Sequence, residues 1–150
     1  MAKLIVADDH PLFRNALINA ISSTFATKAT IETDSFDSTC TALEEHPDTD
    51  LLLLDLHMPG NCGFLGLIQL RKQYPTLPIV VISASDDVDV IKRVMAFGAS
   101  AFIPKSSHPA EIGKALSAVI DGELWVPPAI RSQVMNQQQH QPDLDLASKV

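Results

Sequence analysis

Short apolar runs alternate with longer stretches of helical spacing along most of this chain. Two of the runs, residues 51–54 and 79–82, are apolar throughout, which is typical of strands covered by helices on both faces of a parallel sheet. The alternation therefore predicts an α/β protein with five βα units and a doubly wound, five-stranded parallel sheet. The expected strands are Leu4–Ala7, Ala29–Glu32, Leu51–Leu54, Ile79–Ile82 and Ala101–Ile103.

Residues that commonly mark helix ends lie between these runs. Proline favours the first turn of a helix, aspartate caps the amino end, and glycine commonly closes the carboxyl end. The predicted boundaries are Pro11 for the start of the first helix, Phe36–Glu45 for the second, Gly63–Gln73 for the third with Tyr74-Pro75 ending it, Asp86 or Asp87 to Gly98 for the fourth, and Pro109 to Gly122 for the last.

The composition limits the size of the fold and the classes of partner. A chain of 150 residues with 46% hydrophobic residues can bury one core and leaves little room for a second full domain. Its formal net charge of −7 argues against direct wrapping of nucleic acid or binding to an anionic membrane. The amino end has no signal-peptide pattern, and Cys40 and Cys62 lack zinc-site spacing, so we expect a cytoplasmic protein with no membrane partner.

The composition changes after Trp125. Two prolines follow, and residues 137–142 are glutamine-rich and polar, with little to bury. This segment is therefore interpreted as a linker, within which Ile130 and Val134 have the spacing for one more helical turn against the domain.

Polar residues follow four of the predicted strands at their carboxyl ends. Asp8 and Asp9 follow the first strand, Asp55 follows the third, Ser83 the fourth, and Lys105 comes shortly after the fifth. Because ligands of doubly wound sheets bind outside the carboxyl ends of the strands, we expect these side chains to share one cleft.

The acidic residues of this cleft predict a bound cation. Asp8, Asp9 and Asp55 would repel one another and raise one another's pKa values if no cation lay between them. Mg²⁺ prefers oxygen ligands, and the backbone carbonyl of His57 could complete the set. A flavin cofactor is not expected, because no glycine-rich phosphate loop follows the first strand.

The same residues suggest phosphoryl transfer. A carboxylate beside a metal can attack phosphorus, and Asp55 is the single, central acid of the three. Lys105 would supply an ammonium and Ser83 a hydroxyl donor to the phosphoryl oxygens. Each residue alone has a plainer interpretation as a helix cap, a loop residue or a surface charge. Only their joint placement at the strand ends indicates phosphoryl transfer.

Two histidines and an aromatic residue lie near this constellation. His10 and His57 have no partner at metal-ligand spacing, and we expect neither side chain to take part in the chemistry. Phe102 is interpreted as a packed aromatic side chain rather than a binding platform.

With Asp8-Asp9, the stretch LLLLDLHMPG around Asp55, Ser83 in VVISAS and Lys105 in AFIPK, the sequence resembles the response-regulator receiver family. The match covers about residues 3–122. It implies a flavodoxin-like (βα)5 receiver with strand order 2-1-3-4-5, within a domain of residues 1–125. It also implies Mg²⁺-dependent phosphotransfer from a sensor histidine kinase to Asp55, in a signalling phosphoacceptor that catalyses only its own phosphorylation and dephosphorylation.

Within that family, the stretches ADDHPLFRNAL, DLHMPG and GELWVPP are most similar to the NarL/LuxR (NarL/FixJ) subgroup of two-component transcriptional regulators. This resemblance implies that residues 126–150 are a linker toward a helix-turn-helix domain beyond the end of this chain. DNA would be contacted only through that domain, and activation would favour a homodimer.

The resemblance also implies a switch. Ser83 would turn toward the phosphoryl group and Phe102 would change rotamer behind it, which alters the face formed by the fourth helix, fifth strand and fifth helix.

An alternative from the enzyme class is a small Mg²⁺-dependent phosphatase with an aspartyl-phosphate intermediate. Haloacid dehalogenase-like enzymes of that kind need a second Asp two residues after the nucleophile, where this chain has His57. A receiver that is inactive and serves only for interaction is a third possibility, although none of the five key residues is missing.

Overall fold

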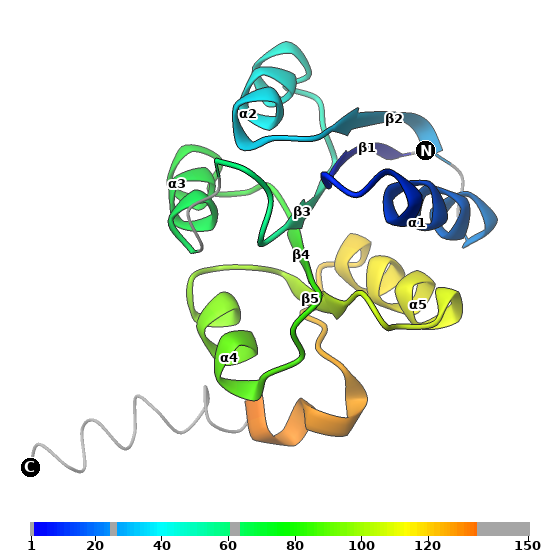
Figure 1. Ribbon diagram of the computed structural model, residues 1–150, viewed down its shortest axis with the longest axis vertical. Helices are drawn as coiled ribbons and strands as arrows, with labels where there is room; N and C mark the ends of the chain where they lie inside the picture. The colour runs from blue at the N-terminus through cyan, green and yellow to red at the C-terminus, as the bar shows by residue number, and fades with distance from the viewer. Residues whose placement is uncertain (1, 25–26, 61–63, 135–150) are drawn as a thin grey trace, which may run out of the picture.

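The computed structural model describes residues 2–24, 27–60 and 64–134. Strands and helices alternate through this part of the chain, as predicted (Figure 1). The elements are β1 Ala2–Ala7, α1 Pro11–Thr24, β2 Thr27–Thr33, α2 Phe36–Glu45, β3 Leu51–Asp55, α3 Leu65–Gln73, β4 Ile79–Ser83, α4 Val88–Ala96, β5 Ala101–Pro104, α5 Pro109–Ile120 and the short 3-10 helix η1 Pro128–Ile130.

The strands form one parallel sheet in the order β2-β1-β3-β4-β5, which confirms the predicted topology. Helices α1 and α5 cover one face of the sheet, and α2, α3 and α4 cover the other (Figure 1). Neighbouring side chains of a strand point to opposite faces of the sheet. Because helices cover both faces, the side chains on either face must be apolar. The unbroken leucine run of β3 meets this requirement, and its side chains are fully buried.

Each face of the sheet has its own apolar core. Leu4 and Leu53 pack with Leu17 of α1 and Leu116 of α5 on one face. On the other face, Leu52, Leu54 and Phe102 belong to a cluster with the buried side chains of α2, α3 and α4. Burial of one such leucine contributes about 1.5–3 kcal/mol, so the central strands fix the position of the loops that follow them.

The predicted helix ends are largely confirmed. Asp87 caps α4, its carboxylate accepting a 2.8 Å hydrogen bond from the backbone N–H of Asp89. Gly98 closes the same helix with a φ of +103°, a backbone conformation that L side chains rarely adopt.

Several expected boundaries differ from the structure. Strand β1 begins at Ala2 rather than Leu4, and β3, β4 and β5 each end one residue later than predicted. The second strand runs from Thr27 to Thr33, longer than the predicted Ala29–Glu32, because backbone pairing with β1 continues beyond the apolar residues. Helix α3 begins at Leu65, after Phe64, which provides no side-chain cap. The predicted start at Gly63 and the cysteine Cys62 lie outside the described residues.

Apolar packing continues beyond Trp125. The Trp125 backbone N–H donates to Ser100 at 3.0 Å, and its carbonyl accepts from the Phe102 N–H at 3.1 Å, so this residue lies along β5. Val126 and Val134 are fully buried in the same cluster as Phe102, and Ile130 packs against it. The helical turn suggested by the spacing of Ile130 and Val134 is therefore confirmed. The linker prediction for residues 126–150 stays a prediction, and residues 135–150 lie outside the described residues.

None of the helices in the described part of the chain has the length and apolar character needed to cross a membrane.

Candidate functional site

The strand register explains why acidic residues that are far apart in the sequence lie together. Ala7 of β1 is paired with Leu54 of β3, so Asp8 and Asp55 each come one residue later at the same end of the sheet. Ser83 ends β4 opposite Pro104 of β5, and Lys105 is the next residue. The predicted convergence of strand ends is therefore present in the structure.

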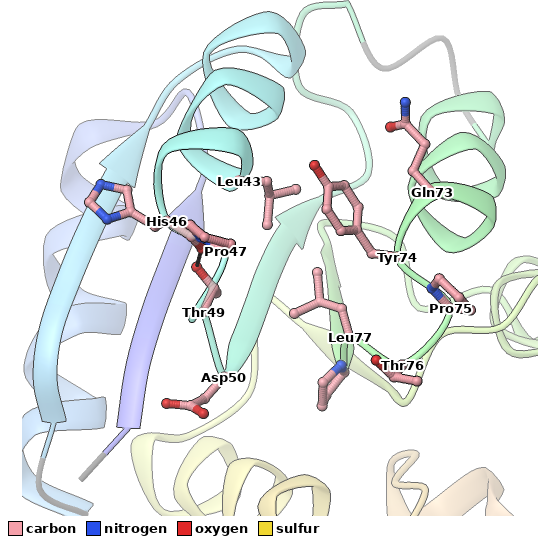
Figure 2. Close-up of a pocket in the computed structure, with 11 residues that line it drawn as sticks. Leu43, His46, Pro47, Thr49, Asp50, Gln73, Tyr74, Pro75, Thr76 and Leu77 are labelled. Atoms are coloured by element: carbon pink, nitrogen blue, oxygen red, sulfur yellow. Dashed lines mark hydrogen bonds between the residues drawn. The ribbon is translucent and has the colours of Figure 1, made fainter.

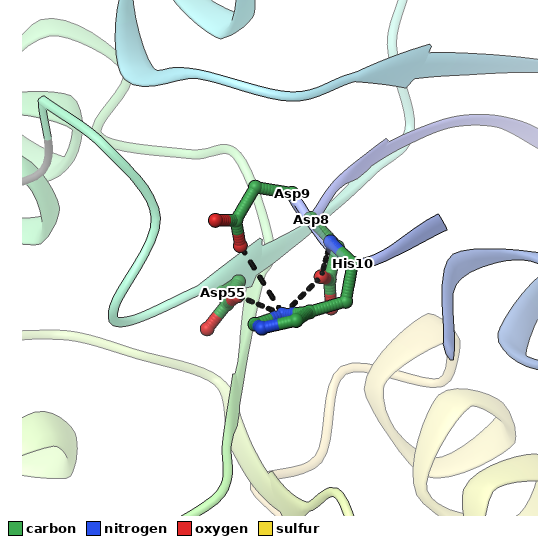
Figure 3. A group of neighbouring side chains, drawn as sticks. All are labelled: Asp8, Asp9, His10 and Asp55. Atoms are coloured by element: carbon green, nitrogen blue, oxygen red, sulfur yellow. Dashed lines mark hydrogen bonds and ion pairs between the residues drawn. The ribbon is translucent and has the colours of Figure 1, made fainter. Parts of the chain in front are cut away.

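Four side chains form a compact acidic cluster at this end of the sheet: Asp8, Asp9, His10 and Asp55. Each offers a ligand atom, and these atoms all lie within 4.8 Å of one another (Figure 3). Asp8 and Asp55 are almost completely buried, with 0% and 1% of their side chains exposed, whereas Asp9 is partly exposed. The cluster is thus open to solvent on the Asp9 and His10 side.

Lys105 supplies the ammonium that faces these acids. Its Nζ lies 3.2 Å from Asp55 Oδ2 and 3.1 Å from Asp8 Oδ2. The same nitrogen is 4.9 Å from the centre of the Phe13 ring, so a cation–π contact helps to hold it over the cluster. Lys105 therefore has the placement that the sequence predicted for it.

Asp55 is the acid whose ionisation is most clearly affected. Burial raises the pKa of Asp55 above its ordinary value, and the nearby charge of Asp8 raises it further. A backbone hydrogen bond from His57 and the ammonium of Lys105 act in the opposite direction without cancelling the effect. An added cation would therefore stabilise the ionised, nucleophilic form of Asp55.

The oxygen atoms of the cluster fit a divalent metal. Asp8 Oδ2 and Asp9 Oδ1 are buried and accept no hydrogen bond within the described part of the chain, although each has an ion-pair partner nearby. Buried carboxylate oxygens without hydrogen bonds are costly unless a cation contacts them. Because Mg²⁺ prefers carboxylate oxygens, the residues present are compatible with the expected metal.

His10 joins this cluster, contrary to the expectation from sequence spacing. Its Nδ1 lies 3.2 Å from both Asp8 Oδ1 and Asp9 Oδ1 (Figure 3). The position follows from the turn before α1, where the His10 backbone N–H donates to Asp8 Oδ1 at 2.7 Å. Spacing along the chain could not show this, because the partners of His10 come from two different strand ends.

Arg14 is a second residue that the sequence analysis did not single out. Its Nη1 donates to the backbone carbonyl of Asp8 at 2.5 Å, and its Nε pairs with Glu32 at 2.9 Å. Arg14 thus ties the loop after β1 to the end of β2. Its position four residues after His10, on the first turn of α1, is the sequence signal that could have suggested this contact.

The remaining predicted residues lie around the cluster. The His57 N–H donates to Asp55 Oδ1 at 3.1 Å, so the loop after β3 bends around the carboxylate, while metal binding by the His57 carbonyl stays a prediction. The buried Ser83 hydroxyl accepts a hydrogen bond from the Ser85 N–H at 3.1 Å. Phe102 is paired with Val81 of β4 and is fully buried, and its role as a switch also stays a prediction.

A separate pocket of about 410 Å³ lies at the opposite end of the sheet. Leu43 and Tyr74 face each other across it at the carboxyl ends of α2 and α3, and Asp50 lies below them (Figure 2). Asp50 and Pro78 immediately precede β3 and β4, whereas Asp55 and Ser83 end those strands. This pocket therefore does not contribute to the acidic cluster.

Comparisons with known proteins agree with this architecture. Residues 4–117 match the family model of the response regulator receiver domain. The chain is 42% identical over 130 residues to the glycerol metabolism activator of Pseudomonas putida, a match that covers 87% of this chain and 59% of that relative. The chain thus spans about three fifths of that relative's length.

Solved structures give the same result. A LuxR family DNA-binding response regulator from Silicibacter pomeroyi is similar with a TM-score of 0.74 and 26% identity, over 86% of this chain and 99% of that one. The isolated REC domain of RcsB from Salmonella enterica serovar Typhimurium, in the presence of the phosphomimetic BeF3−, has a TM-score of 0.79 and 22% identity, over 86% and 95% of the two chains. A structure of two RcsB dimers bound to two parallel DNAs also has a TM-score of 0.79 and 22% identity, over 86% and 64%.

Proposed function

Because this chain belongs to the response regulator receiver family and is related to its NarL/LuxR-type transcription regulators, we propose that it is a phosphoacceptor that controls transcription. In this proposal a sensor histidine kinase transfers a phosphoryl group to Asp55 in a Mg²⁺-dependent reaction. The observation that most supports it is a buried nucleophilic carboxylate with two neighbouring carboxylates and one ammonium at 3.2 Å.

The proposed metal ligands are Asp8, Asp9 and Asp55, with the backbone carbonyl of His57. A bound Mg²⁺ supplies positive charge that offsets the carboxylates and the phosphoryl oxygens. An Asp55 carboxylate oxygen forms the new bond to phosphorus, while the bond between phosphorus and the donor nitrogen breaks and its electron pair returns to the kinase imidazole. The Lys105 ammonium and the Ser83 hydroxyl would donate hydrogen bonds to the phosphoryl oxygens.

The signal would pass from this site to a DNA-binding domain. Ser83 turns toward the phosphoryl group, and Phe102 repacks behind β4, which changes the face formed by α4, β5 and α5. This change favours a homodimer, and DNA is contacted through a separate carboxyl-terminal domain. Support comes from the DNA-binding name of the LuxR family relative and from the RcsB dimers on DNA.

The test is phosphorylation by a small donor. The purified chain is incubated with acetyl phosphate, with and without Mg²⁺, and intact mass is used to count phosphoryl groups. We expect one Mg²⁺-dependent group, its loss in Asp55→Ala, and its retention in Asp86→Ala, a matched change at an exposed acid. Undiminished labelling of folded Asp55→Ala would contradict the proposal.

The same samples distinguish the phosphatase alternative. An enzyme of that class would hydrolyse p-nitrophenyl phosphate through many turnovers, whereas a phosphoacceptor would not. His57 occupies the position where that class requires a second Asp, so we expect no such turnover.

A further inference from the structure

His10 lies at the acidic cluster with its ring close to all three carboxylates. Its Nδ1 lies 3.2 Å from Asp8 Oδ1, 3.2 Å from Asp9 Oδ1 and 3.7 Å from Asp55 Oδ2, so one nitrogen faces all three carboxylates (Figure 3). The ring is 62% exposed and is not held by packing. Its position is instead set by the turn after β1 and by the polar atoms of the cluster.

These separations match those between ligands of a single small cation. A tetrahedral Zn²⁺ with bonds of about 2.0–2.1 Å places any two of its ligands about 3.3–3.4 Å apart. The three separations from His10 lie close to that value, and all four ligand atoms lie within 4.8 Å of one another. The four side chains could therefore surround one ion after small side-chain movements.

The chemistry of the individual atoms also favours a cation. Asp8 Oδ2 is completely buried and accepts no hydrogen bond among the described residues. Lys105 Nζ is 2.9 Å from His10 Nδ1, so this ring nitrogen already lies beside a cation. A divalent ion would replace this ammonium as the partner of His10 and Asp8.

We propose that Asp8, Asp9, His10 and Asp55 form a Zn²⁺-binding site in which His10 provides the nitrogen ligand. Zn²⁺ accepts imidazole nitrogen and carboxylate oxygen together, whereas Mg²⁺ prefers oxygen, so His10 favours Zn²⁺ over Mg²⁺. A Zn²⁺ ion with these four protein ligands coordinates the Asp55 carboxylate and therefore competes with the phosphorylation of that residue. This inference rests on the proposed function, because both assign the carboxylates of Asp8, Asp9 and Asp55 as metal ligands.

The first test measures binding of each metal alone by calorimetry, for the wild-type chain and for His10→Ala. We expect His10→Ala to raise the Kd for Zn²⁺ about tenfold or more, equivalent to at least about 1.4 kcal/mol, and to leave the Kd for Mg²⁺ within about twofold. The control is His108→Ala, which removes an exposed imidazole that makes no capping hydrogen bond and should change neither Kd. An unchanged Zn²⁺ affinity in folded His10→Ala, or equal weakening of both metals, would overturn the inference.

The second test detects the ligand directly. In protein with ¹⁵N-labelled histidine, the Nδ1 resonance of His10 is identified as the one that is absent from the spectrum of His10→Gln. Zn²⁺ should shift this resonance, and no other histidine resonance should move comparably. Absence of that shift at saturating Zn²⁺ would overturn the inference even if binding is tight. Normal Mg²⁺ binding and phosphorylation in the same preparation would leave the proposed function intact, whereas failure to bind either metal would contradict both.

Discussion

Asp55 lies in a group of charges that do not balance. Three carboxylates, those of Asp8, Asp9 and Asp55, face the single ammonium of Lys105, which leaves an excess of two negative charges when all are ionised. Burial and the charge of Asp8 raise the pKa of Asp55, so ionising this residue costs the folded protein free energy. The metal-free site is therefore a source of instability that a cation can relieve.

The pH dependence of stability tests this charge imbalance. The folded-state pKa of Asp55 is raised, so its penalty is present at neutral pH and disappears as pH falls below the ordinary aspartate value of about 3.9. We expect metal-free Asp55→Asn to be more stable than wild type at pH 7, with a gain that shrinks toward low pH. Urea unfolding at a series of pH values measures this, and a gain that grew on acidification would contradict it.

Lys105 provides a second prediction at this scale. Lys105→Met removes the ammonium beside Asp55, and loss of one stabilising donor commonly lowers a rate by about a hundredfold or more. We expect a decrease of that order in the rate of phosphorylation by acetyl phosphate, with Mg²⁺ affinity retained because a competing cation is gone. Lys114→Met changes an exposed lysine on α5 and serves as the control. A rate within about twofold of wild type would assign Lys105 a structural role only.

The site residues differ in how far sequence could predict them. Asp8 and Lys105 directly follow strands and Asp55 ends one, so the convergence of parallel strand ends was enough to bring them together. His10 and Arg14 depend on the conformation of one turn and on the direction of their side chains. Residue spacing contains neither kind of information, so the sequence analysis set His10 aside and did not single out Arg14.

Among the elements, β5 has the contacts needed to connect the site with the carboxyl-terminal segment. Its residue Phe102 is buried among the side chains under α4, and its backbone N–H donates to Trp125. Val126 and Val134 are buried in the same cluster. A rearrangement of Phe102 would therefore reach residues 125–134 through one hydrogen bond and a shared apolar core.

The burial of Val134 leads to a stability prediction. Val134→Ala removes two methyl groups from a fully buried side chain and should lower the free energy of unfolding by about 1–3 kcal/mol. Gln133→Ala, a change at the exposed neighbour in the same turn, should have little effect. Urea denaturation compares the two variants. Equal stability of Val134→Ala and wild type would show that residues 126–134 do not pack on the domain in solution.

The contact between Phe102 and Trp125 also gives a spectroscopic prediction. Trp125 is the only tryptophan and is 6% exposed, so its emission reports on the packing beside β5. If the proposed switch operates, Mg²⁺ with beryllofluoride should change the intensity or wavelength of this emission in wild type but not in Asp55→Asn. Identical spectra for a wild-type protein shown by mass spectrometry to bind the mimic would contradict transmission through Trp125.

The ends of the elements were less predictable than their order. Apolar periodicity located the strands and most helices, because burial on both faces of the sheet imposes it. The end of β2 is set by backbone hydrogen bonds, which its flanking threonines can make as well as apolar residues can. The start of α3 lacks a side-chain cap, so no local residue marks it.

At the scale of the whole molecule, the parallel sheet determines the location of the chemistry. All five strands point their carboxyl ends toward one edge, where the acidic cluster and Lys105 lie. Helices on both faces keep the strand ends rigid, so the carboxylates stay close despite their repulsion. The apolar pattern predicted the parallel sheet, and the observed strand order confirms it, whereas the predicted domain boundary at residue 125 stays a prediction.

The central claim is that Asp55 itself accepts the phosphoryl group. Borohydride reduces an aspartyl phosphate to homoserine, so the most direct measurement is peptide sequencing by mass spectrometry after Mg²⁺-dependent phosphorylation and reduction. We expect homoserine at position 55 and at no other aspartate position. Homoserine at position 8 or 9, or a phosphoryl group found on His10 with position 55 unmodified, would contradict it.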